Sequence, residues 1–102
     1  MSQSNTPNSF RARTLAVHGG TMRTPFGETS EAMFLTSGYV YETAEAAEAR
    51  FKGEDDGFIY SRFANPTVRM FEERMIALEG AEDARATATG MAAVTSAMLC
   101  QL

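Results

Sequence analysis

The sequence predicts an α/β fold, and three consecutive stretches carry that prediction. The first runs from Asn65 to Gly80 and predicts a helix, because Asn65 followed by Pro66 is a favoured helix start and glycine a favoured stop. Residues 84–89, ARATAT, predict a strand, and the apolar run after Gly90 predicts a second helix. A strand, a glycine and a helix in this order are typical of α/β folds.

The helix after Asn65 has an amphipathic pattern. Its apolar residues recur at steps of three and four, which predicts a single buried stripe: Val68, Phe71, Met75 and Leu78. Charged residues occupy the other faces: Arg69, Glu72, Glu73 and Glu79. We therefore expect this helix to pack along the stripe, with its methionines acting as core residues.

The first half of the chain has weaker signals. Residues 1–9 have the composition of a disordered tail, and residues 10–30 show neither a helical nor a strand period, so they predict an extended arm. Residues 33–41 are rich in aromatic and β-branched residues and predict a short extended piece with a bend. Thr43 is then a candidate cap for a short helix that ends at Gly53.

Composition excludes several classes of function. The 102 residues carry 9 basic and 13 acidic side chains, a net charge of -4, which does not favour binding to nucleic acid. Cys100 is the single cysteine, so no intrachain disulfide forms, and a reducing cytoplasm is expected. No signal peptide or membrane span is predicted. The acidic GEDDG stretch, residues 53–57, lacks the ligand spacing of a calcium loop; we expect a solvated loop and no metal site.

Tyr60 and Arg62 form the first candidate site. If residues 58–62 are extended, the two side chains point to the same side, because side chains alternate along a strand. A guanidinium can bind two phosphate oxygens and a phenol can donate to a third. The alternative is structural: the tyrosine packs locally and the arginine pairs with a carboxylate such as Asp56.

Gly90 marks the second candidate site. Backbone amides at a helix start can bind an anion, and the helix dipole adds to the attraction. One glycine between a strand and a helix is also compatible with a plain connecting turn.

Two motifs resemble a known family. YSRFANPT, residues 60–67, and LEGAEDARATATGMAAV, residues 78–94, are similar in content and order to signature stretches of the pyridoxal-phosphate enzymes of cysteine and methionine metabolism, the trans-sulfuration family. The likeness runs from about Thr14 to the last residue. It implies fold type I, the aspartate aminotransferase-like three-layer α/β fold. Residues 10–63 would be an N-terminal arm with one short helix, and residues 64–102 the truncated start of the cofactor domain.

The resemblance also implies roles for the two candidate sites. Tyr60 and Arg62 match residues that reach across a subunit boundary to the phosphate of the neighbouring protomer's pyridoxal 5'-phosphate. Gly90 and Met91 match the helix start that binds the phosphate within its own subunit. A homo-oligomer follows, expected to be a tetramer built from dimers that share active sites. The family's Schiff-base lysine lies beyond this sequence, so Lys52 is not expected to serve, and no catalytic residue is assigned.

The activity implied by the resemblance is the joining of sulfide to O-succinylhomoserine, which gives homocysteine for methionine biosynthesis. Other trans-sulfuration reactions remain open: cystathionine γ-synthase or γ-lyase, and methionine γ-lyase. A non-catalytic phosphate-binding or assembly fragment, or an inactive remnant, is the alternative from another class. The apolar last helix and its interruption at Leu102 lead us to expect the front portion of a longer, cytoplasmic enzyme. We expect His18 to make a local hydrogen bond and Cys100 to be buried.

Overall fold

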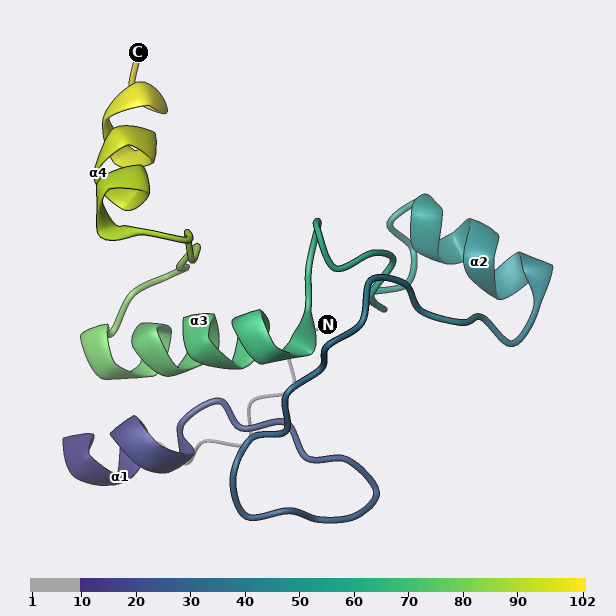
Figure 1. The fold of residues 1–102 in the computed structure, drawn as a ribbon, viewed down its shortest axis with the longest axis horizontal. Helices are drawn as coiled ribbons and strands as arrows, with labels where there is room; N and C mark the ends of the chain where they lie inside the picture. The colour runs from purple at the N-terminus through teal and green to yellow at the C-terminus, as the bar shows by residue number, and fades with distance from the viewer. Residues whose placement is uncertain (1–9) are drawn as a thin grey trace.

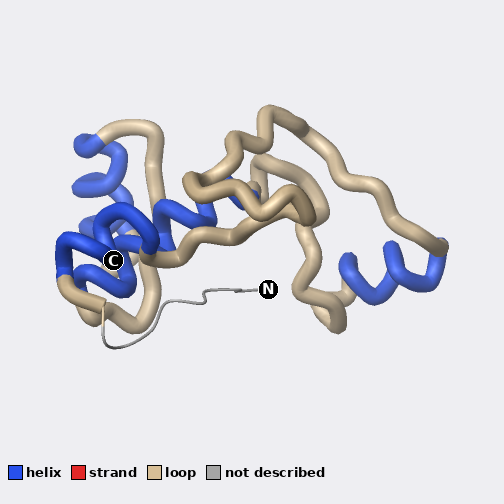
Figure 2. The backbone as a smooth tube through the Cα atoms, turned by 90° about the horizontal axis from the view of Figure 1, so that it is seen from below, coloured by secondary structure: helices blue, strands red, loops and turns tan. Residues whose placement is uncertain are grey.

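A computed structural model describes residues 10–102; the predicted tail, residues 1–9, lies outside the described residues. Four helices follow one another along the chain: α1 (Ala12–His18), α2 (Ala44–Phe51), α3 (Pro66–Glu79) and α4 (Gly90–Leu99). Figure 1 shows α1 and α3 side by side, α2 at one end of the molecule and α4 at the other. Figure 2 shows helices joined by long loops.

The described residues contain no strand. Their β structure is an isolated antiparallel bridge between Gly38 and Tyr60. Residues 84–89, predicted as a strand, are a loop, so this prediction was wrong for the structure of this chain. A strand forms when a neighbouring strand pairs with its backbone, and residues 10–102 provide no such neighbour here. The backbone amide of Ala86 donates instead to the Glu72 carboxylate, at 2.8 Å.

The packing of α1 and its following loop against α3 forms the small core. Met70, 1% exposed, is its buried hydrophobic side chain, and the Met22 amide donates to the Met70 sulfur at 3.1 Å. α1 corrects the sequence analysis, which expected an extended arm without a helix over residues 10–30. Its seven residues are too few to display a clear helical period, and contact with α3 compensates for weak intrinsic helicity.

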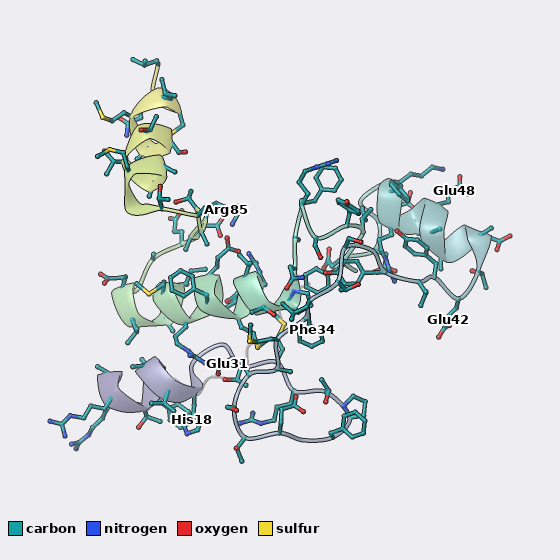
Figure 3. The ribbon with its side chains drawn as sticks, viewed as in Figure 1. His18, Glu31, Phe34, Glu42, Glu48 and Arg85 are labelled. Carbon is teal, nitrogen blue, oxygen red and sulfur yellow. The ribbon has the colours of Figure 1, made fainter. Side chains whose placement is uncertain are left out.

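Arg74 fastens the segment after α1 onto α3. Its Nε donates to the Gly19 carbonyl at 2.9 Å, and one Nη atom donates to the Thr21 hydroxyl at 3.2 Å. The guanidinium also pairs with Glu31, with N–O distances of 3.3 and 3.2 Å. Glu31 lies between this segment and α3 in Figure 3. One side chain therefore binds three points of a segment that has little core of its own.

The apolar stripe predicted for α3 is not its buried face. Val68, Phe71 and Leu78 are 45%, 55% and 37% exposed, whereas Met70 and Glu72 are buried. The predicted ends of α3 are confirmed: the Asn65 side chain accepts from the Thr67 amide, Pro66 opens the helix and Gly80 closes it at φ 63°. The stripe is exposed because α1 and its loop cover the opposite side of α3.

The helix predicted from Thr43 is confirmed. Thr43 caps α2 by accepting from the Ala46 amide at 3.0 Å, and Gly53 follows the helix at φ +78°. The extended piece over residues 33–41 is also confirmed, with its bend at Ser37 and Gly38. Among residues 10–102 we find no helix with the length and apolar character that crossing a membrane would require.

Candidate phosphate-binding site

The candidate site begins with a tight turn before α3. Residues 61–63 form this turn, in which the amides of Phe63 and Ala64 both donate to the Tyr60 carbonyl, at 2.9 and 3.1 Å. The strand-like course expected through residue 62 is therefore wrong: the bridge to Gly38 at Tyr60 is followed at once by the turn.

Tyr60 and Arg62 nevertheless lie together. The guanidinium carbon of Arg62 is 5.1 Å from the centroid of the Tyr60 ring and 5.2 Å from that of Phe63. Both candidate residues are exposed, with Tyr60 at 39%. The predicted proximity is present, although it comes from the turn rather than from strand alternation. Arg50 of α2 pairs with Asp55 of the acidic loop at 3.6 Å.

A groove runs between this turn, α3 and the segment after it. Its volume is about 520 Å³, and its charged lining comprises three arginines, Arg62, Arg69 and Arg85, and the acidic residues Asp56 and Glu72. Arg69 pairs with Glu72 and Glu73 at 3.6 and 3.1 Å. Arg85 pairs with Asp83 at 2.7 Å. Arg62 instead contacts the two rings.

Asp83 is fixed at the start of the segment that leads to α4. The Ala84 amide donates to its carboxylate at 2.9 Å, and this bond, followed by the Arg85 pair, holds the pKa of Asp83 below its ordinary value. Arg85, which lines the groove, is therefore already paired with a carboxylate.

The second candidate site is the start of α4. Thr89 caps this helix: its hydroxyl accepts from the Ala92 amide at 3.0 Å, and its carbonyl accepts from the Ala93 amide at 3.2 Å. Gly90 is the first helical residue and Met91, 73% exposed, is the second, so the predicted helix start is confirmed. The first amides of a helix have no acceptor within it and carry part of the positive end of the dipole. The Thr89 cap uses the Ala92 amide, which leaves the amides of Gly90 and Met91 as the ones that could face an anion.

The structure does not bring the two candidate sites together. α4 stands clear of the segment that joins α2 to α3 in both views. α4 also exposes its apolar side chains, including Val94 and Met98 at 54% and 66%. Cys100, expected to be buried, is exposed as well, since no other element of the described chain covers this helix.

Other residues considered from the sequence have local roles. Lys52 pairs with Glu48 at 2.7 Å on the exposed side of α2. The His18 carbonyl accepts from the Thr21 hydroxyl at 3.1 Å; this bond uses the backbone, so a local bond of the His18 imidazole stays a prediction. Residues 10–102 contain no group of three or more His, Cys, Asp or Glu side chains arranged to hold a metal.

Three structurally important residues were missed as such from the sequence: Glu72, Arg74 and Ser61. From the sequence, Glu72 counts among the charged faces of the helix and Arg74 is not singled out, because no local pattern distinguishes either residue. Ser61 lies inside the YSR motif, so its position between two candidate residues was the available signal.

Comparison with known proteins identifies the class. Residues 13–102 match the family model described as Cys/Met metabolism PLP-dependent enzyme, and the chain belongs to this family. Pyridoxal 5'-phosphate is therefore the cofactor that family membership implies. A guanidinium, a phenol and helix-start amides are each donors that suit a phosphate group, although the described chain does not bring them to one point.

Three relatives show which enzymes of this family the chain is similar to. The chain is 59% identical over 86 residues to O-succinylhomoserine sulfhydrylase of Pseudomonas aeruginosa, covering 84% of this chain and 21% of the relative. It is 53% identical over 92 residues to the enzyme of the same name from Mycobacterium tuberculosis, covering 90% and 23%. L-methionine gamma-lyase of Porphyromonas gingivalis is 41% identical over 85 residues, covering 83% and 21%. The chain thus spans about a fifth of the length of these relatives.

Proposed function

We propose that this chain is the N-terminal part of a pyridoxal-phosphate-dependent sulfhydrylase that makes homocysteine from O-succinylhomoserine and sulfide. The observation that carries the proposal is the identity to two O-succinylhomoserine sulfhydrylases, 59% and 53%, compared with 41% to a methionine gamma-lyase. When bound, the cofactor supplies an electron sink for chemistry at the amino-acid carbons. This chain would supply phosphate binding and subunit contact.

The phosphate would be bound by residues from two copies of the chain. Tyr60 and Arg62 of one copy and the helix start at Gly90 and Met91 of the other would surround a group with nearly two negative charges. The separation of the turn from α4 within one chain supports this division, because neither half completes the other in the same copy. Neither donor set alone would provide both a guanidinium fork and a helix dipole.

The proposal extends to the whole enzyme. The exposed apolar residues of α3 and α4 would be covered in a three-layer α/β cofactor domain, in which residues 84–89 gain strand neighbours. Residues 10–63 would serve as the arm, residues 64–102 as the start of the domain, and the assembly would be a cytoplasmic homotetramer. Segments outside these residues would supply the catalytic lysine and bind the amino-acid substrate.

The binding part is tested on the 102-residue chain. Equilibrium dialysis with pyridoxal phosphate should give saturable binding that Arg62→Ala weakens by about tenfold or more, since a charge-assisted bidentate contact is lost. Arg85→Ala is the matched control: it removes an arginine from the same groove whose partner is Asp83, and it should bind like the parent chain. Equal loss in both variants, or no saturable binding by the parent, contradicts the proposal.

The activity part needs a complete enzyme. A chimaera would carry this chain in place of the matching segment of the Pseudomonas aeruginosa sulfhydrylase. It should form homocysteine from O-succinylhomoserine and sulfide. A chimaera that instead cleaves methionine by elimination would favour the gamma-lyase alternative.

A further inference from the structure

Ser61 lies between the two candidate phosphate-binding residues and is tied to the rest of the arm. Its backbone amide donates to the Ser37 carbonyl at 2.8 Å, and its hydroxyl donates to the Thr36 carbonyl. The Asn65 side-chain amide donates to the same hydroxyl at 2.9 Å, and the Tyr39 hydroxyl lies 3.1 Å from it. Four contacts from two separate segments, residues 36–39 and Asn65, therefore meet at one small residue.

The protons at this hydroxyl can be assigned. A serine hydroxyl has one proton to donate and two lone pairs that accept. Because that proton goes to the Thr36 carbonyl, Ser61 can only accept from Tyr39, whose single hydroxyl proton is shared between Ser61 at 3.1 Å and the Ala64 carbonyl at 3.4 Å. The hydroxyl of Ser61 then makes one donated and two accepted bonds, and its full capacity is used.

Asn65 does more than cap α3. A helix cap needs an acceptor, which Asn65 supplies through its Oδ1 to the Thr67 amide at 2.9 Å. The Nδ2 group makes two further bonds, to the Phe34 carbonyl and to the Ser61 hydroxyl, each at 2.9 Å. With 8% exposure, the side chain is buried between the arm and α3. Serine at this position would cap the helix equally well but would provide no such pair of donors.

These bonds bear directly on the orientation of the turn. Ser61 is half-buried and faces the arm, whereas Tyr60 and Arg62 on either side of it are exposed. Were the Ser61 side chain released, the backbone bond from its amide to the Ser37 carbonyl would remain, but the turn would lose its side-chain contacts with Thr36, Tyr39 and Asn65. The Tyr60 carbonyl accepts from the amides of Phe63 and Ala64. These bonds close the turn internally and do not attach it to the arm.

We propose that Asn65 and Ser61 are positioning residues: the Nδ2 group of Asn65 and the hydroxyl of Ser61 hold the turn so that Tyr60 and Arg62 present their donors together to a phosphate. The inference rests on the function proposed above for Tyr60 and Arg62. It adds that the asparagine is required for its amide donors and not only for its cap. A second, independent readout separates it from a role in folding alone.

Asn65→Ser is the first test variant, because it stays neutral and keeps a cap acceptor while replacing the two Nδ2 donors with a single, shorter hydroxyl. Ser61→Ala, which leaves the cap of α3 untouched, is the second. Thr43→Ala is the matched control, since it removes a helix cap on α2 without changing the turn. Circular dichroism should show that Asn65→Ser and Ser61→Ala retain the helix content of the parent chain.

The ligand-free readout is the chemical shift of the Arg62 side-chain protons. These protons lie against the Tyr60 and Phe63 rings, so ring currents displace their resonances. Asn65→Ser and Ser61→Ala should move them toward random-coil values, and Thr43→Ala should not. Unchanged Arg62 resonances in both test variants overturn the proposal, whether or not the chain binds phosphate.

The second readout is affinity for pyridoxal phosphate, with inorganic phosphate as a simpler probe. Each test variant should bind about tenfold more weakly than the parent. A tenfold change in affinity corresponds to the free energy of about one net hydrogen bond, which is what each variant removes from the support of the turn. Unchanged affinity with shifted resonances overturns the proposed link to phosphate. Shifted resonances in a chain whose parent form does not bind the cofactor contradict the proposed function while supporting the positioning role.

Discussion

The guanidinium of Arg62 rests 5.1 Å from the centre of the Tyr60 ring, so the two residues proposed to bind phosphate face each other across an exposed turn. An exposed contact of this kind contributes only about 0.5–1 kcal/mol, less than a charge-assisted bidentate bond to an anion. The ring therefore orients the arginine without competing strongly with a phosphate. The contact is compatible with binding.

The fork of Arg62, and not only its charge, should matter. Arg62→Lys keeps a positive charge but loses the planar pair of donors, so pyridoxal phosphate should bind about tenfold more weakly. Isothermal titration calorimetry measures the change, with Arg85→Lys as the control in the same groove. Equal affinities of Arg62→Lys and the parent chain would mean that charge alone suffices.

Glu31 should titrate below the ordinary range of a glutamate. The hydrogen bonds from Arg74 lower its pKa, with smaller contributions from the Glu31 backbone and from the charges of Arg74 and His18. A lowered pKa in the folded chain means that the pair adds stability above the unfolded pKa and loses it as the pH falls through the folded value. A carbon-13 titration of the Glu31 carboxyl in the parent chain and in Arg74→Met checks this; the variant should titrate near the ordinary value.

Gly20 should tolerate no side chain. Its φ is +73°, and an added Cβ would lie 2.7 Å from the Cβ of Glu73 and 3.0 Å from the Arg74 amide. Gly20→Ala should lower the free energy of unfolding by about 1–3 kcal/mol. Gly27→Ala is the control, because its φ is +68° but no atom lies within 4 Å of the added Cβ. Urea denaturation that shows equal losses in the two variants would exclude close packing on α3 as the cause.

Glu72 should hold the segment before α4 in place. Its carboxylate is buried and accepts from the Ala86 amide at 2.8 Å. Glu72→Ala should speed hydrogen exchange at Ala86, whereas Glu72→Gln keeps an oxygen acceptor and should speed it less. Glu79→Ala, on the exposed last turn of α3, controls for a general loss of helix stability. Slow exchange at Ala86 in Glu72→Ala would show that another contact fixes this segment.

The sequence predicted those elements whose signals are local. Asn65 with Pro66, Gly80 and Thr43 mark helix ends because each residue's own hydrogen bond or backbone preference sets the boundary. The strand at residues 84–89 was not formed because strand pairing depends on a distant neighbour that local composition cannot provide. The buried face of α3 was misassigned for the same reason: which side of an amphipathic helix is covered depends on where α1 lies.

The same distinction between local signals and long-range contacts applies to the candidate site. The YSR motif and the glycine at the helix start pointed to Tyr60, Arg62, Gly90 and Met91, and the structure places them at an exposed turn and at a capped helix start. Their roles at a phosphate remain predictions. The support from Asn65 and Ser61 could not be predicted, because it depends on contacts with residues 34–39 that a linear pattern does not reveal.

The central claim is that one phosphate is held by two copies of the chain, and mixing two defective variants tests it most directly. Arg62→Ala disables one half. Gly90→Pro disables the other by removing one amide; proline suits the first helical position, and Thr89 already has the extended conformation, with ψ 158°, that a following proline requires. Each variant alone should bind pyridoxal phosphate poorly.

An equimolar mixture of Arg62→Ala and Gly90→Pro, dissociated and reassociated, should regain about a quarter of the parent chain's binding sites, because random pairing gives half mixed dimers and each has one intact site of two. Equilibrium dialysis counts these sites. A mixture that binds no better than the separate variants would contradict a phosphate site shared between two copies.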